Sequence, residues 1–235
     1  MKRLASVWIV AVVLMSMTFG LAGGCFAADA AQTYTDVSPN SWYYEPIQTL
    51  SEAGIVNGVG NGKFAPNETV SRAMAVTIIY RIAGCPDASS LENPFTDVPD
   101  GKWFTDAVKW AAANEITNGM TETSFAPHAP VTREQLACFV FRYGNLIHAR
   151  ITAPLEYAPY GVALELYDED QISPFAKEAC SRMIRRGIFT GNHGYLYPHD
   201  PCTRAEAVTV LYRFKDGLDK FGTYDPLLPP PEPDV

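Results

Sequence analysis

Three segments of this chain carry apolar residues at the spacing of an amphipathic helix. These stripes fall within positions 76–83, 137–144 and 208–212, and a spacing of three to four residues places their members on one helical face. Each stripe follows a Ser or Thr suited to a helix N-cap, and two of these caps precede the Gln or Glu of a capping box. The predicted caps are Ser71, Thr132 and Thr203. The pattern therefore predicts three similar helices.

The residues before these helices repeat as well. The stretch 34–37 (Tyr-Thr-Asp-Val) aligns without a gap on 95–98 (Phe-Thr-Asp-Val), and downstream of both a Trp, a Gly, a Phe-Ala-Pro and two Arg residues coincide. A third, more diverged copy begins near Asp168 and has Phe175 where the other copies have Trp. Self-similarity of this kind indicates a repeat protein. The predicted repeats span residues 34–84, 93–146 and 160–216.

Each copy reads as helix, loop, helix. The aspartate and the turn after it suit a helix entrance, and the Gly- and Asn-rich stretch 57–62 is typical of a tight loop. One such helix pair cannot bury both of its apolar faces, so the three pairs must share a core. Neither end of the array shows a polar capping repeat, which favours closure over linear stacking. The predicted fold is all-α, with three helix–loop–helix repeats in a pseudo-threefold closed bundle.

The two ends of the chain differ from the repeats. Residues 1–28 have a basic start, an uncharged apolar run and small residues at its end, which is typical of a cleaved secretory signal. A membrane anchor and a lipoprotein signal acylated at Cys25 remain alternatives. After signal cleavage we expect no membrane span, because no other segment is apolar over the ~20 residues that a bilayer requires. Residues 217–235 are rich in Pro and predict a disordered tail.

Charge narrows the possible partners. The chain has 18 Lys and Arg against 26 Asp and Glu, a net charge of −8, and signal cleavage would remove two further positive charges. We therefore expect no nucleic-acid partner, since nucleic-acid binding needs a basic footprint.

Cysteine and histidine positions give little sign of special chemistry. Cys138 and Cys180 fall at apolar helical positions and are expected in the core, with a Cys180–Cys202 disulfide as an alternative. No metal-ligand spacing and no catalytic constellation is found in the sequence. We therefore expect no cofactor, no metal and no enzymatic activity.

The combined motifs resemble the S-layer homology (SLH) repeat. Phe/Tyr-Thr-Asp-Val, a Trp, Gly-Ile, Phe-Ala-Pro and Ser/Thr-Arg-Ala/Glu follow one another in the first two copies, and the stretch 168–176 is similar to a common variant opening of that repeat. The resemblance covers roughly residues 34–216. It implies a helical spindle whose inter-repeat grooves bind secondary cell-wall polysaccharide, often pyruvylated. It also implies a secreted protein at the cell wall, with S-layer or other surface proteins as neighbours.

The resemblance assigns three glycan-binding positions to each repeat: the aspartate, the aromatic residue after it and the arginine of Thr-Arg-Ala-Glu. Repeat one departs from that tetrapeptide at Met74, and repeat two departs at Glu134 and Gln135. These departures predict that the grooves do not bind equally. The implied glycan-binding residues are Asp36, Trp42, Arg72, Asp97, Trp103, Arg133, Asp168, Phe175 and Arg204.

Each residue type in this set has a structural alternative. An arginine fork matches the carboxylate of a pyruvate ketal, and free amides in the first helical turn would add to the attraction; alternatively, each arginine pairs with an aspartate of its own or a neighbouring repeat. The tryptophans either stack on sugar faces or belong to the core. The aspartates serve as ligands or as helix caps. The recurring Arg81, Arg142 and Arg213 suit the negative helix end and are expected to be structural.

The sequence therefore favours a non-catalytic wall-anchoring module. Two other functions remain open. The repeats could mediate assembly with other surface proteins, or, as a less favoured alternative, the protein could hydrolyse wall glycan.

Overall fold

The computed structural model describes residues 34–149 and 166–223. The predicted signal at 1–28 and the end of the predicted tail lie outside these residues. Within the described part, regular structure is helical, with six α-helices and one short 3₁₀ helix. None of these helices has the length and apolar character that a membrane crossing requires.

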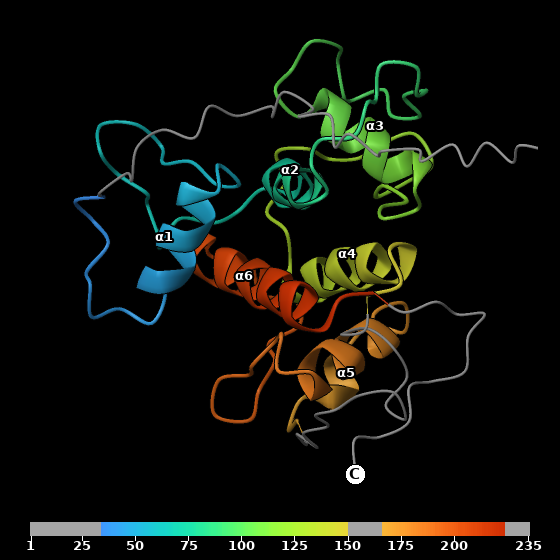
Figure 1. The fold of residues 1–235 in the computed structure, drawn as a ribbon. Coiled ribbons are helices and arrows are strands. Elements are labelled where there is room, and N and C mark those ends of the chain that lie inside the picture. The colour runs from blue at the N-terminus through green and yellow to red at the C-terminus, as the bar shows by residue number, and fades with distance from the viewer. Residues whose placement is uncertain (1–33, 150–165, 224–235) are drawn as a thin grey trace, which may run out of the picture.

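Every repeat contributes one outer and one inner α-helix, as the sequence predicts. In Figure 1 the inner helices meet at the centre of the molecule and the outer helices surround them. The outer helices are α1 (Tyr44–Glu52), α3 (Thr105–Ala113) and α5 (Lys177–Arg185). The inner helices are α2 (Arg72–Ile82), α4 (Arg133–Leu146) and α6 (Arg204–Phe221), and the 3₁₀ helix η3 (Glu169–Gln171) precedes α5.

Each outer helix packs on the inner helix of the preceding repeat in cyclic order. Helix α3 packs on α2, α5 packs on α4, and α1 closes the circle by packing on α6. No repeat therefore completes its own core, because the apolar face of each outer helix is covered by a neighbouring repeat. This arrangement confirms the predicted pseudo-threefold closed bundle.

A ring of backbone hydrogen bonds closes the bundle at the entrance of the inner helices. The amide of Val70 donates to the carbonyl of Cys202, Cys202 donates to Val131, and Val131 donates to Val70, each at 2.9 Å. Each bond joins one repeat to another, and the three bonds form a closed cycle. Closure of this kind removes the need for polar capping repeats.

The inner helices begin at the predicted caps. The Ser71 hydroxyl accepts from the Met74 amide at 3.2 Å, and both predicted capping boxes are present at Thr132 and Thr203. The next amides, however, are not free to bind an anion. The amides of Arg72 and Ala73 donate to carbonyls of the next repeat at 2.9 and 3.0 Å, and the same pairing occurs at α4 and α6. The expected anion attraction by free first-turn amides was therefore wrong.

The core contains the predicted stripes and three of the four described cysteines. Ile47, Leu50, Val76 and Ile79 are fully buried. Cys138, Cys180 and Cys202 are buried free thiols, so the alternative of a Cys180–Cys202 disulfide was wrong. Their apolar surroundings suit small hydrophobic side chains.

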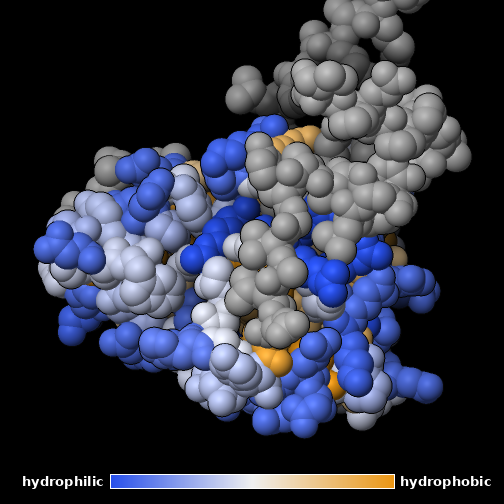
Figure 2. All heavy atoms as spheres, turned by 90° about the horizontal axis from the view of Figure 1, so that it is seen from below, coloured by the Kyte–Doolittle hydropathy of each residue, from blue (hydrophilic) through white to orange (hydrophobic). Residues whose placement is uncertain are grey.

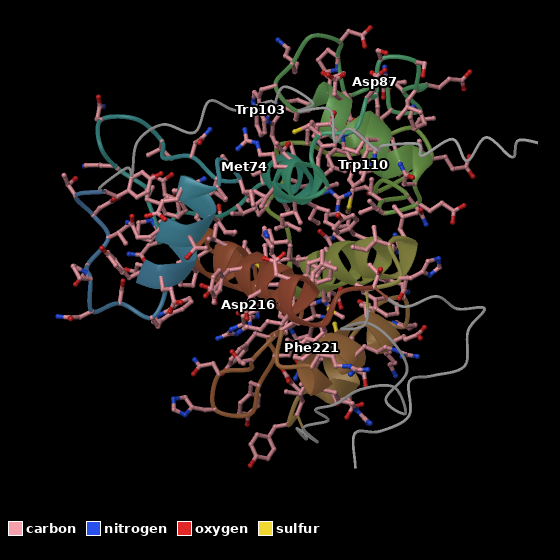
Figure 3. The ribbon with its side chains drawn as sticks, viewed as in Figure 1. Met74, Asp87, Trp103, Trp110, Asp216 and Phe221 are labelled. Carbon is pink, nitrogen blue, oxygen red and sulfur yellow. The ribbon has the colours of Figure 1, made fainter. Side chains whose placement is uncertain are left out.

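Helix α6 extends beyond the predicted end of the third repeat. It runs to Phe221 and ends at Gly222, whose φ of 68° breaks the helix. Two exposed ion pairs at i,i+4 spacing, each at 2.6 Å, join Lys215 to Asp219 and Asp216 to Lys220 and stabilise this last part of the helix. The first five residues of the predicted tail are therefore helical (Figure 3).

Candidate functional site: the grooves between repeats

The recurring aromatic residues lie on the surface. Trp42, Trp103 and Phe175 immediately precede the outer helices and are 61%, 58% and 59% exposed. The alternative that the tryptophans belong to the core was wrong. The next residue takes the inner place instead: Phe104 is buried and meets the Trp103 ring edge-on at 5.1 Å between centroids.

The recurring aspartates hold the central loops. The Asp36 carboxylate accepts from the amides of Phe64 and Ala65, both at 2.8 Å, and Asp97 and Asp168 bind the equivalent loops in the same way. The second amide in each loop belongs to a residue in the left-handed region, such as Ala65 with a φ of 57°. The expectation of helix capping was wrong, because the outer helices have no side-chain N-cap.

These amide bonds lower the pKa of two of the aspartates, Asp36 and Asp97. Burial raises the pKa of Asp36, but hydrogen bonds from the amides of Phe64 and Ala65 outweigh burial and lower the pKa below its ordinary value. In Asp97 the Ser124 hydroxyl adds a further donor at 2.8 Å, and the pKa is again lowered despite burial. The Asp36 and Asp97 carboxylates are thus ionised groups that hold their loops.

The three arginines join neighbouring repeats. Arg72, Arg133 and Arg204 are only 2%, 8% and 8% exposed. The Nε atom of each donates to a loop carbonyl of the next repeat: Phe125, Leu196 and Phe64, respectively. The acceptors of the three Nε atoms are thus carbonyls of these loops, and the alternative of direct pairing of the arginines with the repeat aspartates was wrong among the described residues.

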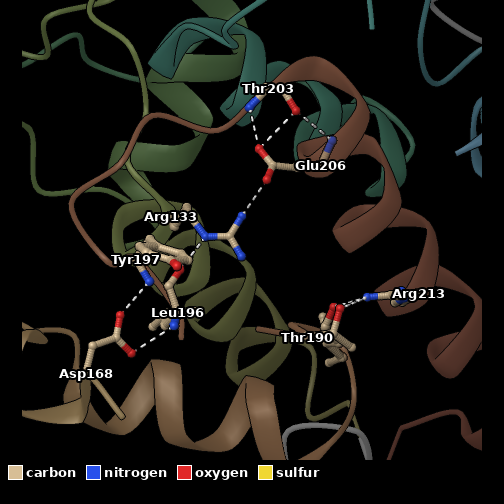
Figure 4. Close-up of polar contacts among 9 residues, drawn as sticks. Arg133, Asp168, Thr190, Leu196, Tyr197, Thr203, Glu206 and Arg213 are labelled. Carbon is tan, nitrogen blue, oxygen red and sulfur yellow. Dashed lines mark hydrogen bonds and ion pairs between the residues drawn. The ribbon is translucent and has the colours of Figure 1, made fainter. Parts of the chain in front are cut away.

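Two equivalent grooves open beside these arginines. The Trp42 groove has a volume of about 430 Å³ and lies between Trp42, the α6 face and the loop 189–192, with Arg133 in its wall. The Trp103 groove has a volume of about 260 Å³ and lies between Trp103, the α2 face and the loop 56–59, with Arg204 in its wall. Figure 4 shows the polar wall of the Trp42 groove, and Figure 3 labels Trp103 and Met74 of the other.

The third equivalent place, beside Phe175, is built differently. Phe139 occupies the helical position that Ile78 has in the Trp103 groove and Val210 has in the Trp42 groove. The guanidinium of Arg72 lies 5.4 Å from the Phe139 ring centroid. The third place thus carries a larger side chain at this position, with the Arg72 guanidinium stacked on its ring.

Some groove residues were not singled out as sites from the sequence. Arg81 and Arg213 line the two grooves, and they also donate to the loops of their own repeats, at 3.0 Å to the Ile55 carbonyl and 3.0 Å to the Thr190 hydroxyl. These bonds agree with the expected structural role. Thr77 and Thr209 also line the grooves. Arg81 and Arg213 occupy the same position in their repeats, and this recurrence is the feature of the sequence that could have identified them as residues of the groove wall.

Comparison with known protein families decides the family. The S-layer homology domain model matches residues 33–75, 94–137 and 166–208, which is more than half of the chain. The chain belongs to the S-layer homology domain family. These matches coincide with the three structural repeats, and the SLH domain is a cell-surface anchoring module.

Individual relatives share the same region. An endoglucanase from Bacillus sp. (strain KSM-635) is 33% identical over 179 residues, which cover 76% of this chain and 18% of that protein. The surface-layer 125 kDa protein of Lysinibacillus sphaericus is 29% identical over 82% of this chain and 16% of its own length. The S-layer protein sap of Bacillus anthracis is 26% identical over 90% of this chain and 25% of its own length. The chain thus spans a quarter or less of these relatives, and the similarity to surface-layer proteins supports a location at the cell surface.

Proposed function

We propose that this protein anchors itself to the cell wall by holding sugar residues of a wall polysaccharide in the Trp42 and Trp103 grooves. The observation that carries the proposal is the same combination in both grooves. Each has an exposed tryptophan, a buried guanidinium in the wall and a loop that contributes an asparagine, Asn192 or Asn57. The proposal includes secretion and no catalytic activity.

The two walls suit the two kinds of surface that a sugar presents. The face of a pyranose ring is apolar and stacks on an aromatic ring, which explains why a tryptophan is exposed rather than buried. The hydroxyl and acidic substituents of a sugar need hydrogen-bond donors and acceptors, and Arg, Thr and Asn side chains supply these. A local guanidinium also allows an acidic protein to hold an acidic polymer such as a pyruvylated polysaccharide.

The arginines have two roles in this proposal. Arg133 and Arg204 are held by loop carbonyls through Nε, and the outer nitrogens lie toward the grooves. Replacing either arginine would therefore disturb the closure of the bundle together with the groove. Arg72 and Phe175 form the third place, where we expect weaker binding because Phe139 is larger than the equivalent Ile78 and Val210.

The tryptophans allow a clean test of the proposal. We would measure sedimentation of the protein with purified wall sacculi, before and after hydrofluoric acid removes the attached polysaccharide. We expect binding to be lost after this treatment, and the double variant with Trp42→Ala and Trp103→Ala to bind at least tenfold more weakly to intact sacculi. Tyr167→Ala is the matched control, since Tyr167 is 75% exposed but lies outside both grooves. Equal binding by the double variant and wild type would overturn the proposal.

The main rival function is assembly with other surface proteins. On the face that Figure 2 shows, the described residues are mainly hydrophilic, with hydrophobic residues only in small patches. Such a face does not favour a large apolar protein interface. Retained binding to sacculi that lack polysaccharide but keep their proteins would favour this rival. Release of soluble fragments from a labelled wall would instead reveal a hydrolase.

A further inference from the structure

The two grooves differ in the residue that faces the buried arginine. In the Trp42 groove, Glu206 of α6 forms an ion pair with Arg133 at 2.9 Å (Figure 4). The equivalent position in the Trp103 groove is Met74 of α2, which lines the groove with Arg204. At the third place, Gln135 of α4 accepts from Arg72 at 3.1 Å. One helical position therefore carries a carboxylate, a thioether and an amide in the three repeats.

The charge of Arg204 is consequently not neutralised by a direct partner. Its guanidinium donates to the carbonyls of Phe64 and Asn57, at 2.8 and 2.9 Å. No carboxylate among the described residues forms an ion pair with it. A carbonyl accepts a hydrogen bond but carries no net charge, so the positive charge remains available to an anion in the groove.

More distant acidic residues do not account for this difference. Asp36 and Glu68 lie near enough to Arg204 to raise its pKa, although burial, the larger effect, lowers it. The Asp36 carboxylate is occupied by loop amides. The Trp42 groove has the same kind of loop clamp in Asp168, and Asp200 occupies the position equivalent to Glu68. The grooves therefore differ in charge at the residue that faces the buried arginine, which is Met74 in the Trp103 groove and Glu206 in the Trp42 groove.

The Trp42 groove has features that suit an uncharged sugar. With Arg133 already paired, an acidic group would meet the Glu206 carboxylate, while a neutral sugar hydroxyl would not be repelled.

We propose that the Trp103 groove selects an acidic sugar and the Trp42 groove selects a neutral one, with Met74 and Glu206 as the specificity-determining residues. This inference rests on the proposed glycan-binding function. It assigns different parts of the polymer to the two grooves. The complete Thr-Arg-Ala-Glu motif of repeat three thus contributes to both grooves, with Arg204 in the groove that selects an acid and Glu206 in the groove that does not.

The experiment uses two probes that differ only in charge. These are the methyl glycoside of a hexose with a 4,6-pyruvate ketal and the methyl ester of the same compound. The protein is labelled with 5-fluorotryptophan, so that the fluorine signals of Trp42 and Trp103, assigned with single Trp→Phe variants, report on each groove separately. We expect the acid to shift the Trp103 signal at concentrations at least tenfold lower than those that shift the Trp42 signal, and the ester to lose this preference.

Three substitutions at two positions test the cause. Met74→Glu introduces the missing carboxylate, and Met74→Gln introduces a neutral side chain of similar length. We expect the acid to bind the Trp103 groove about tenfold more weakly in Met74→Glu than in Met74→Gln, as for loss of one charge-assisted interaction. Glu206→Gln should increase acid binding in the Trp42 groove about tenfold. Gln can still form the capping box, as Gln135 does in repeat two, and circular dichroism verifies that α6 remains intact.

The outcomes separate this inference from the anchoring proposal. The charge assignment would be overturned if Met74→Glu and Met74→Gln bound the acid equally. It would also be overturned if the acid shifted the Trp42 fluorine signal at lower concentrations than the Trp103 signal. If these results came with polysaccharide-dependent binding to sacculi, wall anchoring would stand and only the assignment would fall. If the wild-type protein did not bind sacculi, both the anchoring proposal and the charge assignment would fall.

Discussion

Arg72 tests whether the buried arginines hold the bundle closed. Its side chain joins repeat one to repeat two, with Nε donating to the Phe125 carbonyl at 2.8 Å and one terminal nitrogen donating to Gln135 at 3.1 Å. The guanidinium lies 4.8 Å from the Phe125 ring centroid and 5.4 Å from that of Phe139. Burial lowers the pKa of Arg72 to about 10, and nearby Asp97 raises it, so the group stays charged at neutral pH.

These contacts set the expected size of the effect. A hydrogen bond from a charged donor contributes about 1.5–3 kcal/mol, and each stacking contact with an aromatic ring contributes about 0.5–2 kcal/mol. Desolvation of the guanidinium offsets a large part of the sum, because a buried charge loses its hydration. Arg72→Ala also leaves the Phe125 carbonyl unpaired and opens a cavity. We therefore expect a loss of about 3 kcal/mol in the free energy of unfolding.

Urea denaturation followed by circular dichroism at 222 nm measures this loss. For a domain of this size, about 3 kcal/mol corresponds to a decrease in Tm of about 6–12 °C. Arg72→Met is the matched comparison, because it keeps most of the volume but removes the charge and the donors. We expect Arg72→Met to lie between wild type and Arg72→Ala.

A stability of Arg72→Met equal to that of wild type would refute this reasoning. If Arg72→Met were as stable as wild type, the guanidinium would contribute no net stability. Packing and the backbone ring would then close the bundle without it. A loss below about 1 kcal/mol in Arg72→Ala would refute the reasoning in the same way.

Three further predictions follow from the clamps, the exposed rings and the loop glycines. The folded pKa of Asp36 lies below its unfolded value of ~3.9, so its stabilising effect is complete above that value and is lost as pH falls through the folded pKa. The urea midpoint should therefore be similar at pH 7 and pH 5 and lower at pH 3, and Asp36→Asn should reduce the difference between pH 5 and pH 3. Trp103→Ala should change the free energy of unfolding by less than about 1 kcal/mol, since the side chain is largely exposed, and a loss above about 2 kcal/mol would contradict that view. Gly119→Ala should cost about 2–3 kcal/mol in a thermal melt, because its φ is +76° and a Cβ would lie 2.5 Å from the Phe95 ring. Gly101→Ala is the control for backbone strain alone, since it shares the positive φ but has open space around the Cβ, and equal losses would refute the proposed clash.

The sequence alone determined the repeat, the helices and their caps. These features depend on local rules. The stripe spacing places Val76 and Ile79 on one helical face, and a Ser or Thr at the N-cap position binds an amide of the first helical turn, as Ser71 and Thr203 do. A shared core was also predictable, because one helix pair has more apolar surface than it can bury by itself, and the lack of polar capping repeats favoured closure.

Only the tertiary structure decided which residues meet. The helical entrance of each repeat is paired with loop carbonyls of the next, so the amides that local reasoning left free at Arg72 are occupied. Asp36 binds amides 28 and 29 residues away rather than the nearby helix, and a neighbouring aromatic residue takes the inner place, which leaves Trp103 outside. Such contacts join residues that are distant in sequence, and in the pairing of Arg133 with Glu206 the partners belong to different repeats. Local patterns specify the secondary structure of each segment. The charge of each groove depends on which repeats pack together, because residues of different repeats form its wall.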